Sequence, residues 1–136
     1  MLFLSQFAII QSMKAMHLIW GKVKVGNKRG KSLGFPTMNI TLHKDITDGV
    51  YLSEVKVDDN KFFALTFVGA AKTFNERKKM VESYILNFNK DVYGKWITVR
   101  LFKKIRDNIK FKSEKELVRQ MQKDLIIANA SLKLLI

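Results

Sequence analysis

Two polar residues that follow the chain's only proline have the types and spacing of magnesium ligands. Thr37 and Asn39 lie two positions apart, just after Pro36. In an extended chain, residues i and i+2 point to the same face, so a hydroxyl and an amide oxygen would converge while Met38 points into the core. Such oxygen donors suit a hard cation like Mg²⁺, which keeps several waters. The same side chains could instead hold a turn in place, and the pattern leaves both interpretations open.

A glutamate heads an otherwise apolar or aromatic row in the stretch VESYILNF, residues 81–88. In a strand, successive side chains alternate between faces. The side chains that would share one face are Glu82, Tyr84, Leu86 and Phe88. Carboxylates are rarely buried without a partner. Glu82 therefore lies either at the water-exposed rim of a sheet or facing a ligand cleft.

The segment before Pro36, GNKRGKSLGF, contains Gly-Lys-Ser and at first suggests a P-loop. A P-loop has four residues between its two glycines and runs directly into a helix. Here three residues separate Gly26 from Gly30, and Pro36 pushes Phe35 toward extended geometry, which excludes a helical turn. The composition still suits a loop that wraps an anion with backbone N–H groups. Its glycines and cations are Gly26, Lys28, Arg29, Gly30, Lys31 and Gly34.

A charged stretch, IRDNIKF, lies between the last predicted strand and the C-terminal helix. Arg106 could meet a phosphate or a carboxylate, because its guanidinium matches both groups. Phe111 could pack under a flat ring. Without further context this stretch is a weak indication of a site.

The bulk composition bounds the class of protein. A length of 136 residues suggests one domain, and a hydrophobic fraction of 47% is enough for a core. The absence of cysteine excludes a disulfide scaffold or thiolate metal site and fits a reducing compartment. A net charge of +13 favours anionic partners such as nucleotides, phosphorylated products, nucleic acid or acidic lipid, although a generally basic proteome gives the same value.

The apolar N-terminus is too short and too interrupted to span a bilayer, and it has no features of a signal peptide. Residues 1–15 are either an upstream extension or an added packing segment, since Met13 and Met16 could each be the true start. We predict a single domain over residues 1–136.

The elements that must position these residues are mainly strands. Period-two patterns predict strands over 17–25, 49–57, 61–68, 81–88 and 95–102, and the turn at 58–60 predicts a hairpin between the second and third of them. The short connections suit antiparallel pairing and a barrel. A capping box at Ser113 and Glu116 begins one amphipathic helix. Its apolar residues are Leu117, Val118, Met121, Leu125 and Ala128.

Taken in order, these motifs resemble the riboflavin kinase (flavokinase) family over about residues 18–128. The most specific are R-G-K-x-L-G-F-P-T-x-N at 29–39 and V-E-x-Y-I-L-x-F at 81–88. The others are G-x-V-x-x-G at 21–26, D-G-V-Y at 48–51, D-x-Y-G at 91–94, I-R at 105–106 and K-F-x-S at 110–113.

The resemblance implies a mainly β fold, a six-stranded antiparallel Greek-key barrel with a C-terminal α-helix. It implies transfer of the γ-phosphate of ATP to the 5′-hydroxyl of riboflavin, giving FMN and ADP. The cation would be Mg²⁺, with Zn²⁺ or Mn²⁺ as alternatives. We expect a cytoplasmic monomer that binds neither nucleic acid nor membrane. Only two histidines, His17 and His43, and no H-x-G-H signature are present, so the activity should stop at FMN.

The family's functional residues carry over to this sequence as expectations. Glu82 corresponds to the catalytic base, and Thr37 with Asn39 corresponds to the pair that holds the metal and nucleotide phosphate. The other expected nucleotide-binding residues are Gly26, Gly30, Lys31, Gly34, Ile85, Asn87 and Tyr93. The expected flavin-binding residues are Arg106, Ile109 and Phe111.

Some positions depart from the family pattern. Met38 stands where alanine is usual, Asn87 where aspartate is frequent, and the segment 70–74 replaces a usual Arg-Pro-Thr-Phe. Asn108 and Ile109 replace what are commonly Glu and Lys, which puts the flavin contacts in doubt. Two alternatives therefore stay open. One is a non-catalytic flavin- or nucleotide-binding module, and the other is a basic β-barrel that binds nucleic acid.

Overall fold

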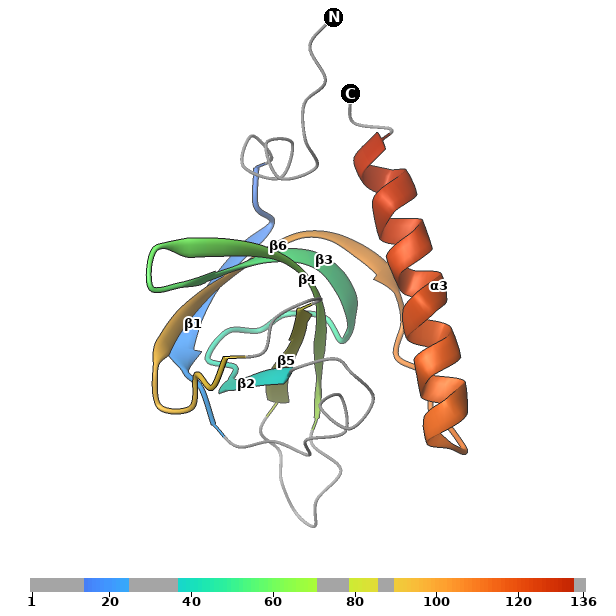
Figure 1. Ribbon diagram of the computed structural model, residues 1–136, viewed down its shortest axis with the longest axis horizontal. Coiled ribbons are helices and arrows are strands. Elements are labelled where there is room, and N and C mark those ends of the chain that lie inside the picture. Colours follow the sequence, from blue (N-terminus) through green and yellow to red (C-terminus); the bar gives the residue numbers. More distant parts are fainter. Residues whose placement is uncertain (1–13, 25–36, 71–78, 86–89, 134–136) are drawn as a thin grey trace, which may run out of the picture.

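The computed structural model (Figure 1) describes residues 14–24, 37–70, 79–85 and 90–133. Within these residues, six strands precede one helix. The strands are β1 (His17–Lys22), β2 (Thr37–Thr41), β3 (Gly49–Val57), β4 (Asn60–Ala70), β5 (Lys79–Ile85) and β6 (Trp96–Arg106), and the helix is α3 (Glu114–Lys133). They form one antiparallel sheet in the order β1-β6-β3-β4-β5-β2. The predicted mainly β, six-stranded fold with a C-terminal helix is confirmed.

Three consecutive strands and a returning fourth give the sheet its Greek-key connection. The strands β3, β4 and β5 pair in sequence, and β6 returns to lie on the other side of β3. The predicted hairpin turn is present: Asp58 and Asp59 have φ values of 47° and 67°, the left-handed conformations that a two-residue hairpin needs. By contrast, β5 and β6 do not pair with each other, although they follow one another in sequence.

The sheet curls until its two edge strands approach each other. Lys24, just after β1, forms an isolated bridge with Asn39 in β2, and its N–H donates to the Asn39 carbonyl at 2.7 Å. Glycine permits this approach, because a Cβ added at Gly21 would lie 3.1 Å from the Cβ of Ile40. The described strands thus make a curled half-barrel whose edges are joined at this bridge.

The inside of the curl is an apolar core with a short chain of hydroxyl groups through it. Residues from every strand enter the main cluster, including Ile19, Ile40, Tyr51, Val68, Ile85 and Val99. The hydroxyls of Ser53 and Thr66 lie 2.6 Å apart, and those of Thr66 and Ser83 lie 2.8 Å apart, all fully buried. Buried polar groups need such partners, so this chain is compatible with the core.

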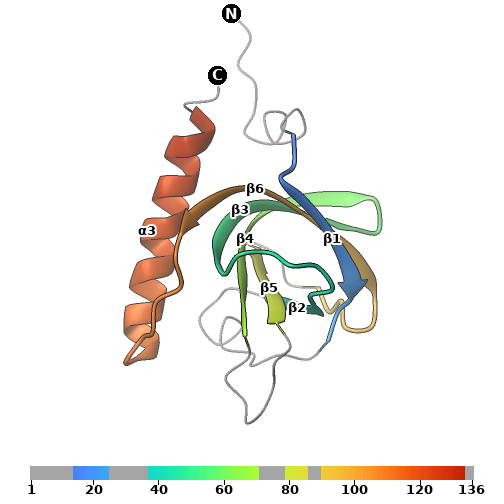
Figure 2. The ribbon, with the colours of Figure 1, turned by 180° about the vertical axis from the view of Figure 1, so that it is seen from behind.

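Helix α3 covers part of the outer face of the sheet (Figures 1 and 2). Half of its capping box is formed: the Glu116 N–H donates to the Ser113 hydroxyl at 3.2 Å, whereas the Glu116 carboxylate accepts from the Lys112 N–H at 3.1 Å, one residue before the N-cap. Ala128 and Leu125 pack against outward side chains of β3, β4 and β6, while Leu117 and Met121 pack against Tyr84 of β5. Because α3 covers what would otherwise be a solvated face, β3 is buried on both faces along most of its length.

Candidate active site

The structure brings Thr37, Asn39 and Glu82 onto one face of neighbouring strands. In the antiparallel β2–β5 ladder, Asn39 is the partner of Glu82 and Thr37 is the partner of Tyr84. Directly paired side chains have Cβ atoms about 4.5–5.5 Å apart. Met38 lies in the core, as predicted, so the face that carries Thr37 and Asn39 is the outer one.

The Asn39 side chain is buried and incompletely bonded. Its relative exposure is 5%, and its Nδ2 has no hydrogen-bond partner among the described residues. An unsatisfied buried polar group typically costs about 1–3 kcal/mol. The Nδ2 group is a hydrogen-bond donor, so an anionic ligand such as a phosphate would supply the acceptor that it lacks.

The carboxylate of Glu82 is held by a tyrosine on its own strand. The Tyr84 hydroxyl donates a hydrogen bond to Oε1 of Glu82. Tyr84 is itself 8% exposed and makes an edge-to-face contact with Phe67, with ring centroids 5.0 Å apart. Phe67 is the β4 partner of Glu82, so the carboxylate emerges beside an aromatic wall.

Arg106, at the end of β6, is bound by a buried aspartate of the helix. Its Nε and Nη2 donate to Oδ1 and Oδ2 of Asp124, both at 2.7 Å, and Asp124 is fully buried. Gln120 donates a third bond to this carboxylate at 3.1 Å. The sequence left open whether Arg106 meets a phosphate or a carboxylate, and the structure supplies a carboxylate from the chain itself.

The same guanidinium lies between two aromatic rings at the edge of the site. Its central carbon is 5.6 Å from the ring centroid of Phe67 and 6.0 Å from that of Phe111. Phe111 also packs against the cluster of Tyr84, Leu117 and Met121. Through these contacts Arg106 and Phe111 connect β4, β5, β6 and α3. Both residues therefore lie near the outer face of β5, which carries Glu82.

The loop between β6 and α3 is anchored at its start. Nδ2 of Asn108 donates to the carbonyl of Val68 at 3.0 Å. Nζ of Lys104 lies 2.6 Å from Oδ1 of Asp107; this hydrogen bond lowers the pKa of Asp107 and raises that of Lys104. Ile109 follows with 49% of its surface exposed, so an apolar side chain projects from an anchored loop.

The remaining expected nucleotide-binding residues are placed differently. Ile85 is 1% exposed and lies in the core, so its side chain points away from the outer face. Tyr93 is partly exposed in the turn before β6, which is tied to the end of β1 because the Gly94 N–H donates to the Val23 carbonyl at 2.9 Å. The expected residues that lie outside the described part of the chain are Gly26, Gly30, Lys31, Gly34 and Asn87.

A metal at this site would depend on neutral oxygen donors and phosphate. Within residues 14–24, 37–70, 79–85 and 90–133, no three His, Cys, Asp or Glu side chains gather in a way that could hold an ion. The described donors are the Thr37 hydroxyl and the Asn39 amide, with Glu82 beside them. Mg²⁺ commonly uses few protein ligands together with substrate phosphates, so this donor set fits it.

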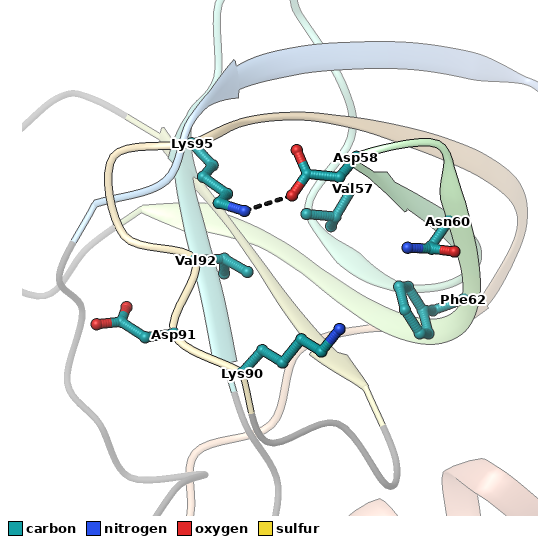
Figure 3. Close-up of a pocket in the computed structure, with 8 residues that line it drawn as sticks. All are labelled: Val57, Asp58, Asn60, Phe62, Lys90, Asp91, Val92 and Lys95. Carbon is teal, nitrogen blue, oxygen red and sulfur yellow. Dashed lines mark hydrogen bonds and ion pairs between the residues drawn. The ribbon is translucent and has the colours of Figure 1, made fainter.

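A small pocket lies at the β3–β4 hairpin and the turn before β6, and none of Thr37, Asn39 and Glu82 lines it (Figure 3). Its volume is about 60 Å³, and the Lys95–Asp58 ion pair crosses its rim. Ligand pockets for small organic molecules are usually about 300–1,000 Å³. The lining residues are Val57, Asp58, Asn60, Phe62, Lys90, Asp91, Val92 and Lys95. This pocket is too small to hold a flavin or nucleotide.

Comparisons with known proteins agree with the sequence motifs and with the fold. The family model described as "Flavokinase: Riboflavin kinase" matches residues 13–132. The chain belongs to the riboflavin kinase family. Among described residues of this riboflavin kinase domain, no helix has the length and apolar character to cross a membrane.

Individual relatives and solved structures are also similar to this domain. It is 38% identical over 114 residues to the bifunctional riboflavin kinase/FMN adenylyltransferase of Buchnera aphidicola subsp. Acyrthosiphon pisum, covering 80% of this chain and 36% of the relative. The riboflavin kinase structure from Trypanosoma brucei matches with a TM-score of 0.60 and 26% identity, covering 85% and 79%. A Streptococcus pneumoniae structure described as a macrolide-efflux protein matches with a TM-score of 0.74 and 35% identity, covering 82% and 38%.

Two contributors to the site were not expected from the sequence. Tyr84 was placed on the same face as Glu82, but its bond to the carboxylate was not foreseen. Asp124 interrupts the apolar row of the helix between Met121 and Ala128, and a charge at that position was a readable signal of a buried partner.

Proposed function

We propose that this riboflavin kinase domain transfers the γ-phosphoryl group of ATP to the 5′-hydroxyl of riboflavin. The observation that carries the proposal is the pairing of Asn39 with Glu82 in the β2–β5 ladder. Membership of the family indicates the reaction class. The pairing brings the Asn39 amide, a proposed metal ligand, next to the Glu82 carboxylate, the proposed base.

In this reaction the 5′ oxygen forms a bond to the γ-phosphorus, and the bond from that phosphorus to the β–γ bridging oxygen breaks. The hydroxyl proton passes to the Glu82 carboxylate, and ADP leaves. An alcohol is a weak nucleophile, so a carboxylate within hydrogen-bond reach contributes about 10²–10⁴-fold. Most of the remaining acceleration in phosphoryl transfer comes from positioning and charge stabilisation.

Thr37 and Asn39 would hold Mg²⁺ and the phosphates next to Glu82. When bound, Mg²⁺ neutralises charge that develops on the β- and γ-phosphates. The Asn39 Nδ2, which has no partner among the described residues, supports the phosphate part of this role, because an N–H group can donate to a phosphate oxygen while the amide oxygen would meet the cation. The segment between Lys24 and Thr37, which holds Lys31 and the glycines, begins and ends beside these residues and would cover the phosphates.

The flavin would lie on the aromatic side of Glu82. Phe111 packs beside Tyr84, and Ile109 projects from the adjoining loop. Arg106 would act here by holding Phe67 and Phe111 in place, since its guanidinium already binds Asp124. We expect the domain to be cytoplasmic and to act as a monomer, and light scattering of the purified protein would test the monomeric state.

The direct test is a product assay. Purified protein is mixed with riboflavin and MgATP, and the flavins are separated by chromatography. Formation of FMN with an equal amount of ADP supports the proposal. Riboflavin binding without FMN formation by folded protein would contradict it and favour a flavin-binding module. The assay with EDTA in excess is the control for the metal, and manganese or zinc can then be added back.

A further inference from the structure

Tyr84 and Glu82 are joined by a hydrogen bond on the outer face of β5. The two residues are separated by one position, so their side chains point the same way. The Tyr84 hydroxyl donates to Oε1 of Glu82. From this bond we propose that Tyr84 is a positioning residue, which orients the Glu82 carboxylate toward the hydroxyl that attacks ATP. The inference rests on the proposed function, in which Glu82 accepts that proton.

A carboxylate on a flexible side chain needs such an anchor to act efficiently. The terminal torsion of a glutamate is broad, so its two oxygens can take many directions in water. A donor at Oε1 fixes the plane of the carboxylate. A misplacement of about 1 Å at a reacting group can cost about 10²-fold in rate, so this orientation has a kinetic value.

Tyr84 is suited to this role because packing fixes its own ring. It is buried against Leu117 and Met121 of α3, and its ring meets the edge of Phe67 at an interplanar angle of 71°. Met121 is fully buried. The Tyr84 side chain therefore links the orientation of the carboxylate to the docking of the C-terminal helix on the sheet.

A buried tyrosine hydroxyl ordinarily finds a partner, so a purely structural role for this bond is the competing explanation. The chain offers a matched control. Tyr51 is also buried, and its hydroxyl donates to the Thr47 carbonyl at 2.6 Å on the inner side of the sheet. Removing either hydroxyl makes the same chemical change, but only Tyr84 contacts the proposed base.

The experiment compares kcat and KM in the variants Tyr84→Phe, Glu82→Gln, their double variant and Tyr51→Phe. We expect Tyr84→Phe to lower kcat about 10- to 100-fold, within the range for a misplaced reacting group, with both KM values changed less than about twofold. The double variant should be no slower than Glu82→Gln alone, because Tyr84 acts through that carboxylate. Tyr51→Phe should keep the wild-type kcat.

Each contrary outcome has a distinct meaning. A wild-type kcat in Tyr84→Phe, or a double variant in which the two losses multiply, overturns the positioning role while leaving Glu82 as the base. A Glu82→Gln variant that keeps full kcat overturns the base assignment and the role of Tyr84 together. An equal loss in Tyr51→Phe and Tyr84→Phe indicates a general structural effect, which thermal unfolding of the four proteins would show directly.

Discussion

Asn39 and Glu82 face each other across the β2–β5 ladder, although they come from distant parts of the chain. Neither residue alone indicates phosphoryl transfer. Their pairing places an amide whose nitrogen has no partner in the described part of the chain next to a carboxylate that accepts a hydrogen bond from Tyr84. The chemistry of the site therefore depends on strand register, since a shift of one residue would turn one of the two side chains into the core.

Replacing Glu82 with glutamine should abolish most turnover and leave substrate binding. The variant keeps the size of the side chain and one acceptor oxygen for the Tyr84 hydroxyl but cannot accept the proton, so kcat should fall about 10²–10⁴-fold. Steady-state rates and ATP binding by calorimetry would measure the two effects. Glu114→Gln at the start of α3 is the matched control and should keep the wild-type rate. Loss of ATP binding together with turnover would indicate a structural defect.

Replacing Asn39 with alanine should separate activity from stability. The change removes a buried amide whose Nδ2 has no described partner, so the free energy of unfolding should fall by less than about 1 kcal/mol. FMN formation should need more Mg²⁺ or be lost, because the side chain is a proposed ligand. Magnesium titrations and urea unfolding measure these quantities. A large loss of stability with an unchanged magnesium requirement would contradict the proposed ligand role.

Replacing Asp124 with asparagine should destabilise the protein. The change leaves the Arg106 guanidinium, which is mostly buried, without its counter-ion. Breaking a buried pair by removing one partner typically costs about 3–5 kcal/mol, which urea unfolding can resolve. The control is Asp107→Asn, which removes an aspartate whose side chain is 89% exposed, and it should shift the unfolding midpoint far less, because exposed ion pairs contribute little to stability. Equal losses of stability in the two variants would show that the buried pair stabilises the protein no more than the exposed one.

Replacing Ile109 with serine should weaken riboflavin binding selectively. The side chain is half exposed on the loop after β6, so its removal should not change the thermal midpoint. Losing the burial of an aliphatic side chain against a flavin corresponds to about 1.5–3 kcal/mol at most, or roughly 10- to 200-fold in the riboflavin KM. The KM for ATP should stay constant. A rise in the ATP KM alone would place Ile109 at the nucleotide.

Local patterns in the sequence predicted most elements of this fold. The strand over residues 49–57 and the turn at Asp58 and Asp59 were predicted from alternation and turn residues, and both are confirmed. The capping box at Ser113 marked the start of the helix. The last strand extends to Arg106, beyond the predicted end at residue 102, because β3 pairs with it through two register shifts that alternation does not reveal.

The site was predicted less completely, because it depends on contacts between distant segments. Thr37 and Asn39 could be recognised from their spacing, but the environment of Glu82 could not, since it is set by the pairing of β5 with β2 and β4. The sequence around Arg106 did not indicate that its partner is Asp124, because this pair forms only when α3 docks on the sheet. Burial of Ile85 is likewise a consequence of how the sheet curls.

The bridge between Lys24 and Asn39 has a consequence for how this enzyme family can diversify. It fastens both ends of the intervening glycine-rich segment to the sheet. As a general rule, doubling the number of residues that connect two fixed points costs only about 0.6 kcal/mol in chain entropy. Changes in the length of this connection should therefore leave the sheet on either side of it intact, and if the proposed nucleotide role of the segment holds, such changes offer a route to a different triphosphate preference.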